Sequence, residues 1–140
     1  MSKELLIEAL NKALGWELRA ITMYAHYSAY ISGIHRIHLS THFNAESIES
    51  VTHAATVRSV IVKLGGIATT ERDNTKIIHT SDYEEMLNEA YTTEEVAAKT
   101  YNELLPLVTT YGDSELYDTL EAIYFDEQRS LEEMRMLLQK

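Results

Sequence analysis

The chain has 140 residues, of which 45% are hydrophobic and 24% are charged, values that are ordinary for one globular domain and exclude a disordered chain. Twelve basic and 22 acidic side chains give a net charge of −10, which argues against a nucleic-acid-binding protein and suits a surface or cavity that gathers cations. Cysteine is absent, which excludes disulfides, zinc–thiolate sites and thiol chemistry.

Glycine and proline are sparse, and their positions divide the chain into helices. One proline and five glycines are too few turn residues for several small strands. Gly33 and the pair Gly65 and Gly66 follow two stretches of helical periodicity, and Gly112 separates two more. The sequence therefore predicts four helices, over residues 3–32, 34–64, 82–111 and 114–138.

The connections between these helices predict their arrangement. Residues 67–81 are polar and β-branched and form a long connection, whereas the other two connections are short. Ser81 and Asp82 offer an N-cap to the third helix. Short first and last links with one long link between them are typical of a four-helix bundle with a crossover. We therefore expect an all-α chain in which residues 1–140 form a single domain.

Each predicted helix carries an apolar stripe that polar residues interrupt near the middle. Positions at alternating steps of three and four are apolar except for Glu17 in the first helix, Glu94 in the third and Glu127 in the fourth. Ser50 and His53 are central in the stripe of the second helix. Antiparallel packing of four helices brings these groups to one level inside the bundle.

Carboxylates buried together require a positive charge. A single buried carboxylate is costly to ionise and tends to protonate, and several in one layer repel one another. No lysine or arginine occupies the four stripes, so a divalent or trivalent metal ion is the economical counter-charge. Carboxylate and imidazole ligands suit iron, manganese or zinc. The alternative is that some of these glutamates face solvent because the helices are rotated.

Four segments form a further pattern along the chain. They are LGWELRAITMY at residues 14–24, ESIESVTHAATVRSVIVKL at residues 46–64, the run Glu85-Met86-Leu87 that leads to Glu94, and Phe125-Asp126-Glu127. In this order and at these separations they resemble the ferritin-like superfamily, and within it bacterioferritin, over nearly the whole chain. The resemblance implies a ferritin-like four-helix bundle with one crossover.

The resemblance also implies a set of metal ligands. Bacterioferritins hold two irons with a lone glutamate on each of two helices and a Glu-x-x-His motif on each of the other two. Carried over position by position, the implied ligands here are Glu17, His53, Glu94 and Glu127. The chain departs from the family pattern twice, because Ser50 replaces a glutamate and Ser130 replaces the second histidine.

Three more residues are candidates for this site. Glu46 lies one turn before Ser50 on the same stripe and can replace the missing carboxylate, and Glu49 on the flank is a weaker candidate. Tyr24 matches a tyrosine close to the metal site of the family, where it would act catalytically by supplying an electron. The alternative is that Tyr24 packs its ring and hydrogen-bonds a carboxylate.

Haem, assembly and location follow as further expectations. The haem-ligating methionine of bacterioferritins falls at Val51, so haem bound in the usual way is not expected. The chain stops just after the fourth helix, without the fifth helix of large cages, so a twelve-subunit shell or a dimer is favoured over a 24-subunit cage. The start of the chain carries neither a basic tail nor a signal peptide, and no stretch approaches the ~20 apolar residues of a membrane span. We expect a cytoplasmic homo-oligomer whose partners are metal ions, not nucleic acid or membrane.

Five of the six histidines have no assigned role. His35, His38 and His42 lie on one side of the second helix and form either an iron entry path, a second metal site at a subunit interface, or a solvated or hydrogen-bonded face. His26 and His79 have no partner that the sequence reveals, so we expect both to be solvated.

Three functions are compatible with this sequence. The first is an iron-binding ferritin-like protein that oxidises Fe²⁺ as a ferroxidase and stores or detoxifies the iron. The second is a non-catalytic bundle that binds a single structural ion. The third is a metal-free assembly subunit.

Overall fold

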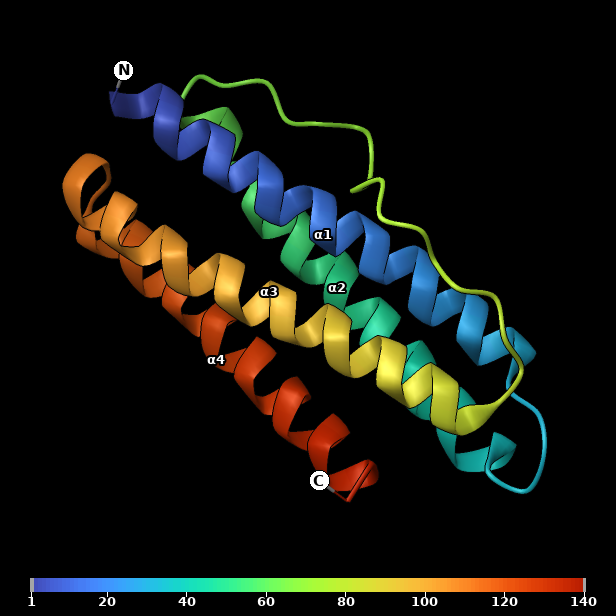
Figure 1. The fold of residues 1–140 in the computed structure, drawn as a ribbon. Helices are drawn as coiled ribbons and strands as arrows, with labels where there is room; N and C mark the ends of the chain where they lie inside the picture. The colour runs from blue at the N-terminus through green and yellow to red at the C-terminus, as the bar shows by residue number, and fades with distance from the viewer. Residues whose placement is uncertain (1, 140) are drawn as a thin grey trace.

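The computed structural model describes residues 2–139, and four α-helices contain most of them (Figure 1). The helices are α1 (Ser2–Tyr30), α2 (Arg36–Lys63), α3 (Tyr83–Tyr111) and α4 (Ser114–Leu137). The described residues contain no strand. Helix α1 packs against α2 and α3, and α3 packs against α4. The predicted all-α bundle and its four helices are confirmed, with each bound within two residues of its expected position.

The helix ends form where the sequence places its glycines and caps. Gly65 has a φ of +83°, and the amides of Gly65 and Gly66 donate to the carbonyls of Val62 and Ile61. This pair of reversed hydrogen bonds is a Schellman motif, which needs a left-handed residue and so favours glycine. At the start of α3, the Asp82 carboxylate accepts from the amide of Glu85 at 2.9 Å, so Asp82 is the N-cap.

The crossover between α2 and α3 runs along α1 in the same direction as that helix (Figure 1). Side chains of α1 hold its backbone at intervals. Asn11 donates to the carbonyl of Ile67 at 3.0 Å, and the Tyr27 hydroxyl donates to the carbonyl of Ile78 at 2.7 Å. Halfway between them, the amide of Asp73 donates to the carbonyl of Gly15 at 2.9 Å. The crossover is thereby fixed over nearly the length of the bundle.

Arg19 is the most strongly bonded of these anchors. Its guanidinium donates to the carbonyls of Thr75 and Lys76 and to the Thr93 hydroxyl, each at 2.9 Å, and stacks over the Trp16 ring at 5.2 Å. One buried side chain therefore joins α1 and α3 to the crossover. Lysine keeps the charge but cannot reproduce the planar fork of donors.

Arg19→Lys is expected to lower the free energy of unfolding by about 3 kcal/mol, because at least two charge-assisted hydrogen bonds are lost. Urea denaturation followed by circular dichroism measures this change. Arg58→Lys, at an exposed position on α2, is the matched control and is expected to leave the denaturation midpoint unchanged. An equal denaturation midpoint for the parent and Arg19→Lys would show that the hydrogen bonds of the Arg19 guanidinium contribute nothing to stability.

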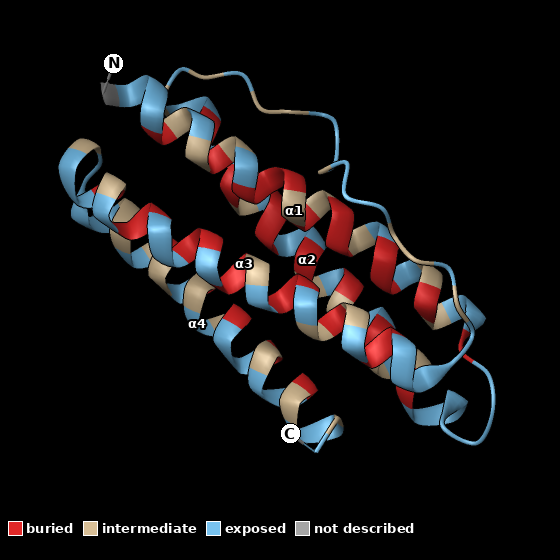
Figure 2. Ribbon diagram, in the orientation of Figure 1, coloured by how far each residue is buried: buried red, intermediate tan, exposed pale blue. Residues whose placement is uncertain are grey.

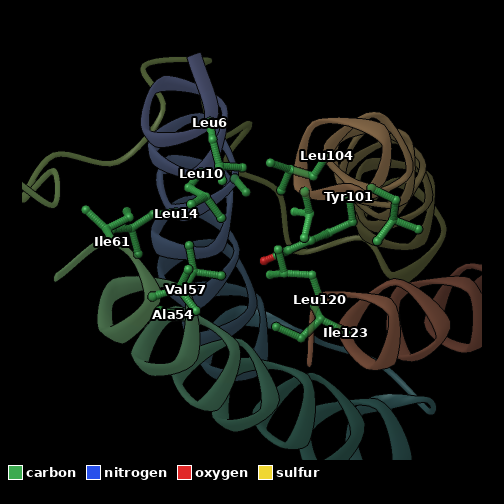
Figure 3. Close-up of a cluster of buried hydrophobic side chains, with 14 residues drawn as sticks. Leu6, Leu10, Leu14, Ala54, Val57, Ile61, Tyr101, Leu104, Leu120 and Ile123 are labelled. Carbon is green, nitrogen blue, oxygen red and sulfur yellow. The ribbon is translucent and has the colours of Figure 1, made fainter. Parts of the chain in front are cut away.

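Two apolar clusters fill the interior. The first lies among the N-terminal half of α1, the C-terminal parts of α2 and α3, and the start of α4. Figure 3 shows Leu10, Val57, Leu104 and Leu120 of the four helices converging in this cluster. The second occupies the opposite end of the bundle and includes Tyr24, Phe43, Met86 and Met134. Buried positions line the inward faces of the helices, whereas the crossover is mostly exposed or half-buried (Figure 2).

No helix among residues 2–139 combines the length and the apolar composition that crossing a bilayer requires.

Candidate metal centre

A polar layer separates the two apolar clusters, and each helix contributes to it. Glu17, His53, Glu94 and Glu127 are all at least 96% buried. They occupy the middle of α1, α2, α3 and α4, in the order expected from the stripes. None of these residues faces solvent, so the rotated alternative is wrong for all four.

Three of the four residues meet at one point. His53 Nδ1 lies 2.9 Å from Glu127 Oε1 and 3.4 Å from Glu17 Oε2. One ligand atom from each of Glu17, His53 and Glu127 lies within 4.8 Å of the other two. Two carboxylate oxygens and one imidazole nitrogen at this spacing are a donor set for a divalent transition metal.

The opposite ring nitrogen of His53 has its own acidic partner. His53 Nε2 lies 3.0 Å from Asp126 Oδ2, and Asp126 directly precedes Glu127 on α4. A carboxylate that accepts from the outer N–H of a histidine fixes the ring and leaves the other nitrogen free to bind a metal. From the sequence alone, Asp126 had no role beyond its place in a motif, because neighbouring residues on a helix point in different directions.

Two buried tyrosines donate hydrogen bonds to the carboxylates of Glu94 and Glu17. The Tyr24 hydroxyl donates to Glu94 Oε1 at 2.5 Å, and the Tyr101 hydroxyl donates to Glu17 Oε2 at 2.6 Å. Burial raises the pKa of both tyrosines well above the ordinary value, and the charges of Glu94 and Glu17 raise it further. The contact of Tyr24 with a carboxylate was the alternative to a catalytic role. The matching contact of Tyr101 was not foreseen.

The layer holds more negative charge than its protein partners balance. Burial raises the pKa of Glu94 well above its ordinary value, and the charge of Glu127 adds to this effect. Burial also raises the pKa of Glu127 well above its ordinary value, and the negative charge of Glu17 raises it further. Glu94 Oε2 is buried and has no hydrogen-bond partner within the described chain. A carboxylate oxygen in this state has a place for a proton or a metal ion.

His53 supplies the positive charge to this layer. Burial lowers the pKa of His53, but the contact with Glu17 and its negative charge, together with Asp126, outweigh burial and raise the pKa to about 9. Without a metal, the ring is therefore protonated at neutral pH and pairs with Glu17 and Asp126. A bound cation would take the place of this proton, so the donor set fits a metal ion.

The two serines that depart from the family pattern are also in the layer. Ser50 and Ser130 are both more than nine-tenths buried. The Ser130 hydroxyl lies 3.3 Å from Glu46 Oε2 and 3.4 Å from Glu49 Oε1, and these two acceptors share its single proton. Burial raises the pKa of Glu46 to about 8, and the charge of Glu94 is the next cause. The structure thus brings Glu46 to the edge of the layer beside Ser130, with Glu49 next to it.

A cavity of about 210 Å³ opens beside Ser130, between α2 and α4. Its walls include His42, Glu46, Glu49 and Ser130. A larger cavity of about 500 Å³ lies further along the same two helices, around Lys63 and Glu115, and contains none of the candidate ligands. The smaller cavity is therefore the one that adjoins the candidate metal centre.

The remaining histidines do not act as one group. His35 packs its ring against Tyr83, with 4.2 Å between ring centroids, and His38 is exposed. His79 is exposed and His26 is half-buried, but the two are not without partners, contrary to what the sequence alone suggested. His26 Nε2 lies 2.9 Å from His79 Nδ1, because the crossover returns along α1 at this level.

Comparison with known proteins agrees with the fold. Residues 7–140 match a family model described as a ferritin-like domain. The structure is similar to a ferritin-like diiron-carboxylate protein from Bacillus anthracis, with 33% identity, a TM-score of 0.93 and coverage of 99% of this chain and 98% of that one. No curated protein sequence matches the chain.

Two further solved structures share the fold at lower identity. One is a bacterioferritin from Desulfovibrio desulfuricans, with 24% identity, a TM-score of 0.90 and coverage of 99% of this chain and 80% of that one. The other is described as a dodecameric thioferritin from Bacteroides fragilis, with 21% identity, a TM-score of 0.90 and coverage of 99% of this chain and 87% of that one.

Proposed function

Because the chain belongs to the ferritin-like domain family, we propose that it binds iron in the polar layer and oxidises Fe²⁺, for storage or detoxification of the iron. The observation that carries this proposal is the convergence of two buried carboxylates on one imidazole, with the unpaired oxygen of a third buried carboxylate, Glu94, in the same layer. The 33% identical relative, which is described as a diiron-carboxylate protein, supports it.

The residues of the layer have separate roles in this proposal. Glu17 and His53 hold the first ion, Glu127 bridges, and Glu94 with Glu46 holds the second. Asp126 keeps the His53 ring in place. Two Fe²⁺ ions supply two electrons, which with two protons convert O₂ to H₂O₂ or H₂O₂ to two molecules of water.

Aerobic loading with Fe²⁺ followed by elemental analysis tests this function. We expect two or more irons per chain, together with a growing near-ultraviolet absorbance of ferric iron. One ion per chain without that absorbance would favour a structural metal, an alternative that the loss of two ligands to Ser50 and Ser130 supports. No bound ion would leave a metal-free assembly subunit, with Glu94 and Glu127 protonated.

Tyr24 is the candidate catalytic residue, and Tyr101 provides a matched comparison because it makes the equivalent bond to Glu17. Tyr24→Phe is expected to slow iron oxidation severalfold without changing the number of ions bound, because the ring can no longer give up an electron and its proton. Tyr101→Phe is expected to keep the parent rate. Stopped-flow absorbance measures both rates, and equal rates in the two variants would remove Tyr24 from the reaction.

We infer that the chain assembles with copies of itself through the outward face of α2. Ile37, Ile48, Val51 and Val62 lie on that face with half or more of each residue exposed, which is unusual for a solvated helix. A second copy is the occupant that the dodecameric relative supports. Val51 in this face offers no metal-ligating atom, and we propose that the protein works without haem.

Ile48→Asp combined with Val51→Asp is expected to convert the oligomer to monomers, because two charges would be buried in the interface. Sedimentation velocity measures the particle mass. Thr92→Asp, an exposed change on α3, is the control and should sediment like the parent. A parent that sediments as a monomer would refute this part of the proposal.

A further inference from the structure

The cavity between α2 and α4 contains a group of metal-ligating side chains that the family pattern does not include. Ser130 lines it, at a position where the resemblance leads us to expect a histidine, and the resemblance also leads us to expect a glutamate at Ser50. Serine side chains are smaller and bind divalent metals weakly, so the second metal position has lost two ligands. The question is whether residues around the cavity of about 210 Å³ replace them.

His42 and Glu46 present two such ligands from one helix. They lie one turn apart on α2, with His42 Nε2 3.8 Å from Glu46 Oε1. His42 Nε2 is buried and has no hydrogen-bond partner in the described part of the chain. A buried ring nitrogen without a partner is costly, and it has the free lone pair that a metal ligand needs when the ring is neutral.

Glu46 connects this histidine to the polar layer. Its other oxygen, Oε2, accepts from the Ser130 hydroxyl at 3.3 Å, and its side chain is only 11% exposed. Glu133 lies on α4 across the cavity, close enough for its negative charge to act on His42. One imidazole and two carboxylates therefore surround the same space from two helices.

We propose that His42 and Glu133 complete the second cation site of this chain, which Glu46 already shares, and that they replace the ligands missing at Ser50 and Ser130. The site would take a divalent transition metal such as Fe²⁺, Mn²⁺ or Co²⁺, because its donors are nitrogen and oxygen. This inference rests on the proposed function, since Glu46 is shared with it. A purely structural role, a helical histidine–glutamate pair, predicts no effect of His42 on metal binding.

Equilibrium dialysis with Co²⁺ under anaerobic conditions tests the site, with the visible absorption of the bound ion as a second readout. The parent is expected to bind two ions per chain. His42→Ala should bind one, with loss of part of the visible absorption. His38→Ala is the matched control, because it removes an exposed histidine one turn away on the same helix, and it should bind two.

A rescue variant separates ligand loss from damage to the fold. Adding Ser130→His to His42→Ala restores the histidine of the family pattern and is expected to return the count to two ions. Two ions in His42→Ala alone, or one ion in the parent, would overturn the inference while leaving the first metal position intact. No ion in the parent would instead overturn the proposed function.

Discussion

Replacing Glu17 and Glu127 together by alanine is expected to abolish iron uptake while leaving the helical content unchanged. These residues supply both carboxylates of the donor group around His53, so the first ion would keep only the ring, and the second ion would lose the ligand that it shares with the first. We expect the affinity for the first ion to fall by more than about a hundredfold, since even the loss of one residue that supports a ligand costs about 10–100-fold. Elemental analysis after Fe²⁺ loading measures the uptake, and circular dichroism measures the helicity.

Glu8→Ala combined with Glu115→Ala is the control for this experiment. It removes the same number of carboxylates from α1 and α4, but at exposed positions outside the layer. It should therefore load iron like the parent, although its net charge is reduced equally. Parent-like uptake in the Glu17 and Glu127 double variant would place the chemistry elsewhere in the molecule.

The metal-free protein is expected to lose stability as the pH rises from 5.5 to 8. Burial raises the pKa of Glu94 and Glu127 well above the ordinary value and that of Glu46 to about 8. Above pH 4.5 the unfolded chain ionises these carboxyls while the folded chain keeps them protonated, so each rise in pH favours unfolding. His53 acts in the same direction, because its folded pKa of about 9 gives a stabilisation that is complete below pH 6.5 and is lost as pH rises through 9.

The expected loss is of the order of several kcal/mol, or about 10 °C in melting temperature for a chain of this size. Differential scanning calorimetry of the chelator-treated protein at pH 5.5 and pH 8 measures it. A saturating divalent ion should raise the melting temperature more at pH 8 than at pH 5.5, because the ligands must be deprotonated to bind.

Glu94→Gln is the variant that isolates the carboxylate contribution to this pH dependence. It keeps the volume of the side chain and removes a buried carboxyl whose pKa is strongly raised. In the metal-free state it should melt above the parent at pH 8 and close to the parent at pH 5.5. A metal-free parent that is equally stable at both pH values would contradict the charge balance described for the layer.

The sequence was sufficient to predict the positions of the helices and the residues that line the polar layer. Hydrophobic periodicity and the positions of glycine are local features of the sequence. Gly33 and Gly65 therefore mark helix ends regardless of which helices pack against them. A glutamate in an otherwise apolar stripe, such as Glu17 or Glu94, has to be buried if the stripe is buried. These predictions needed no knowledge of which helices are neighbours.

The side-chain contacts between helices could not be predicted from the sequence. Asp126 bonds to His53 because of the rotation of α4 relative to α2, and Tyr101 reaches Glu17 across the bundle. His26 meets His79 only because the crossover follows α1. Each contact depends on helix rotation and side-chain rotamer together, and a shift of one residue along either helix would remove it.

By itself, then, the sequence determined that four amphipathic helices would place acidic residues and a histidine in an apolar interior, because side-chain periodicity decides which face is buried. Only the tertiary structure decided which oxygens and nitrogens come within bonding distance. It brought Glu17, His53 and Glu127 together, gave Glu94 and Glu17 their tyrosine partners, and left a cavity beside Ser130. The physical reason is that burial follows from the pattern along one helix, whereas coordination geometry requires ångström-scale positions that several helices set jointly.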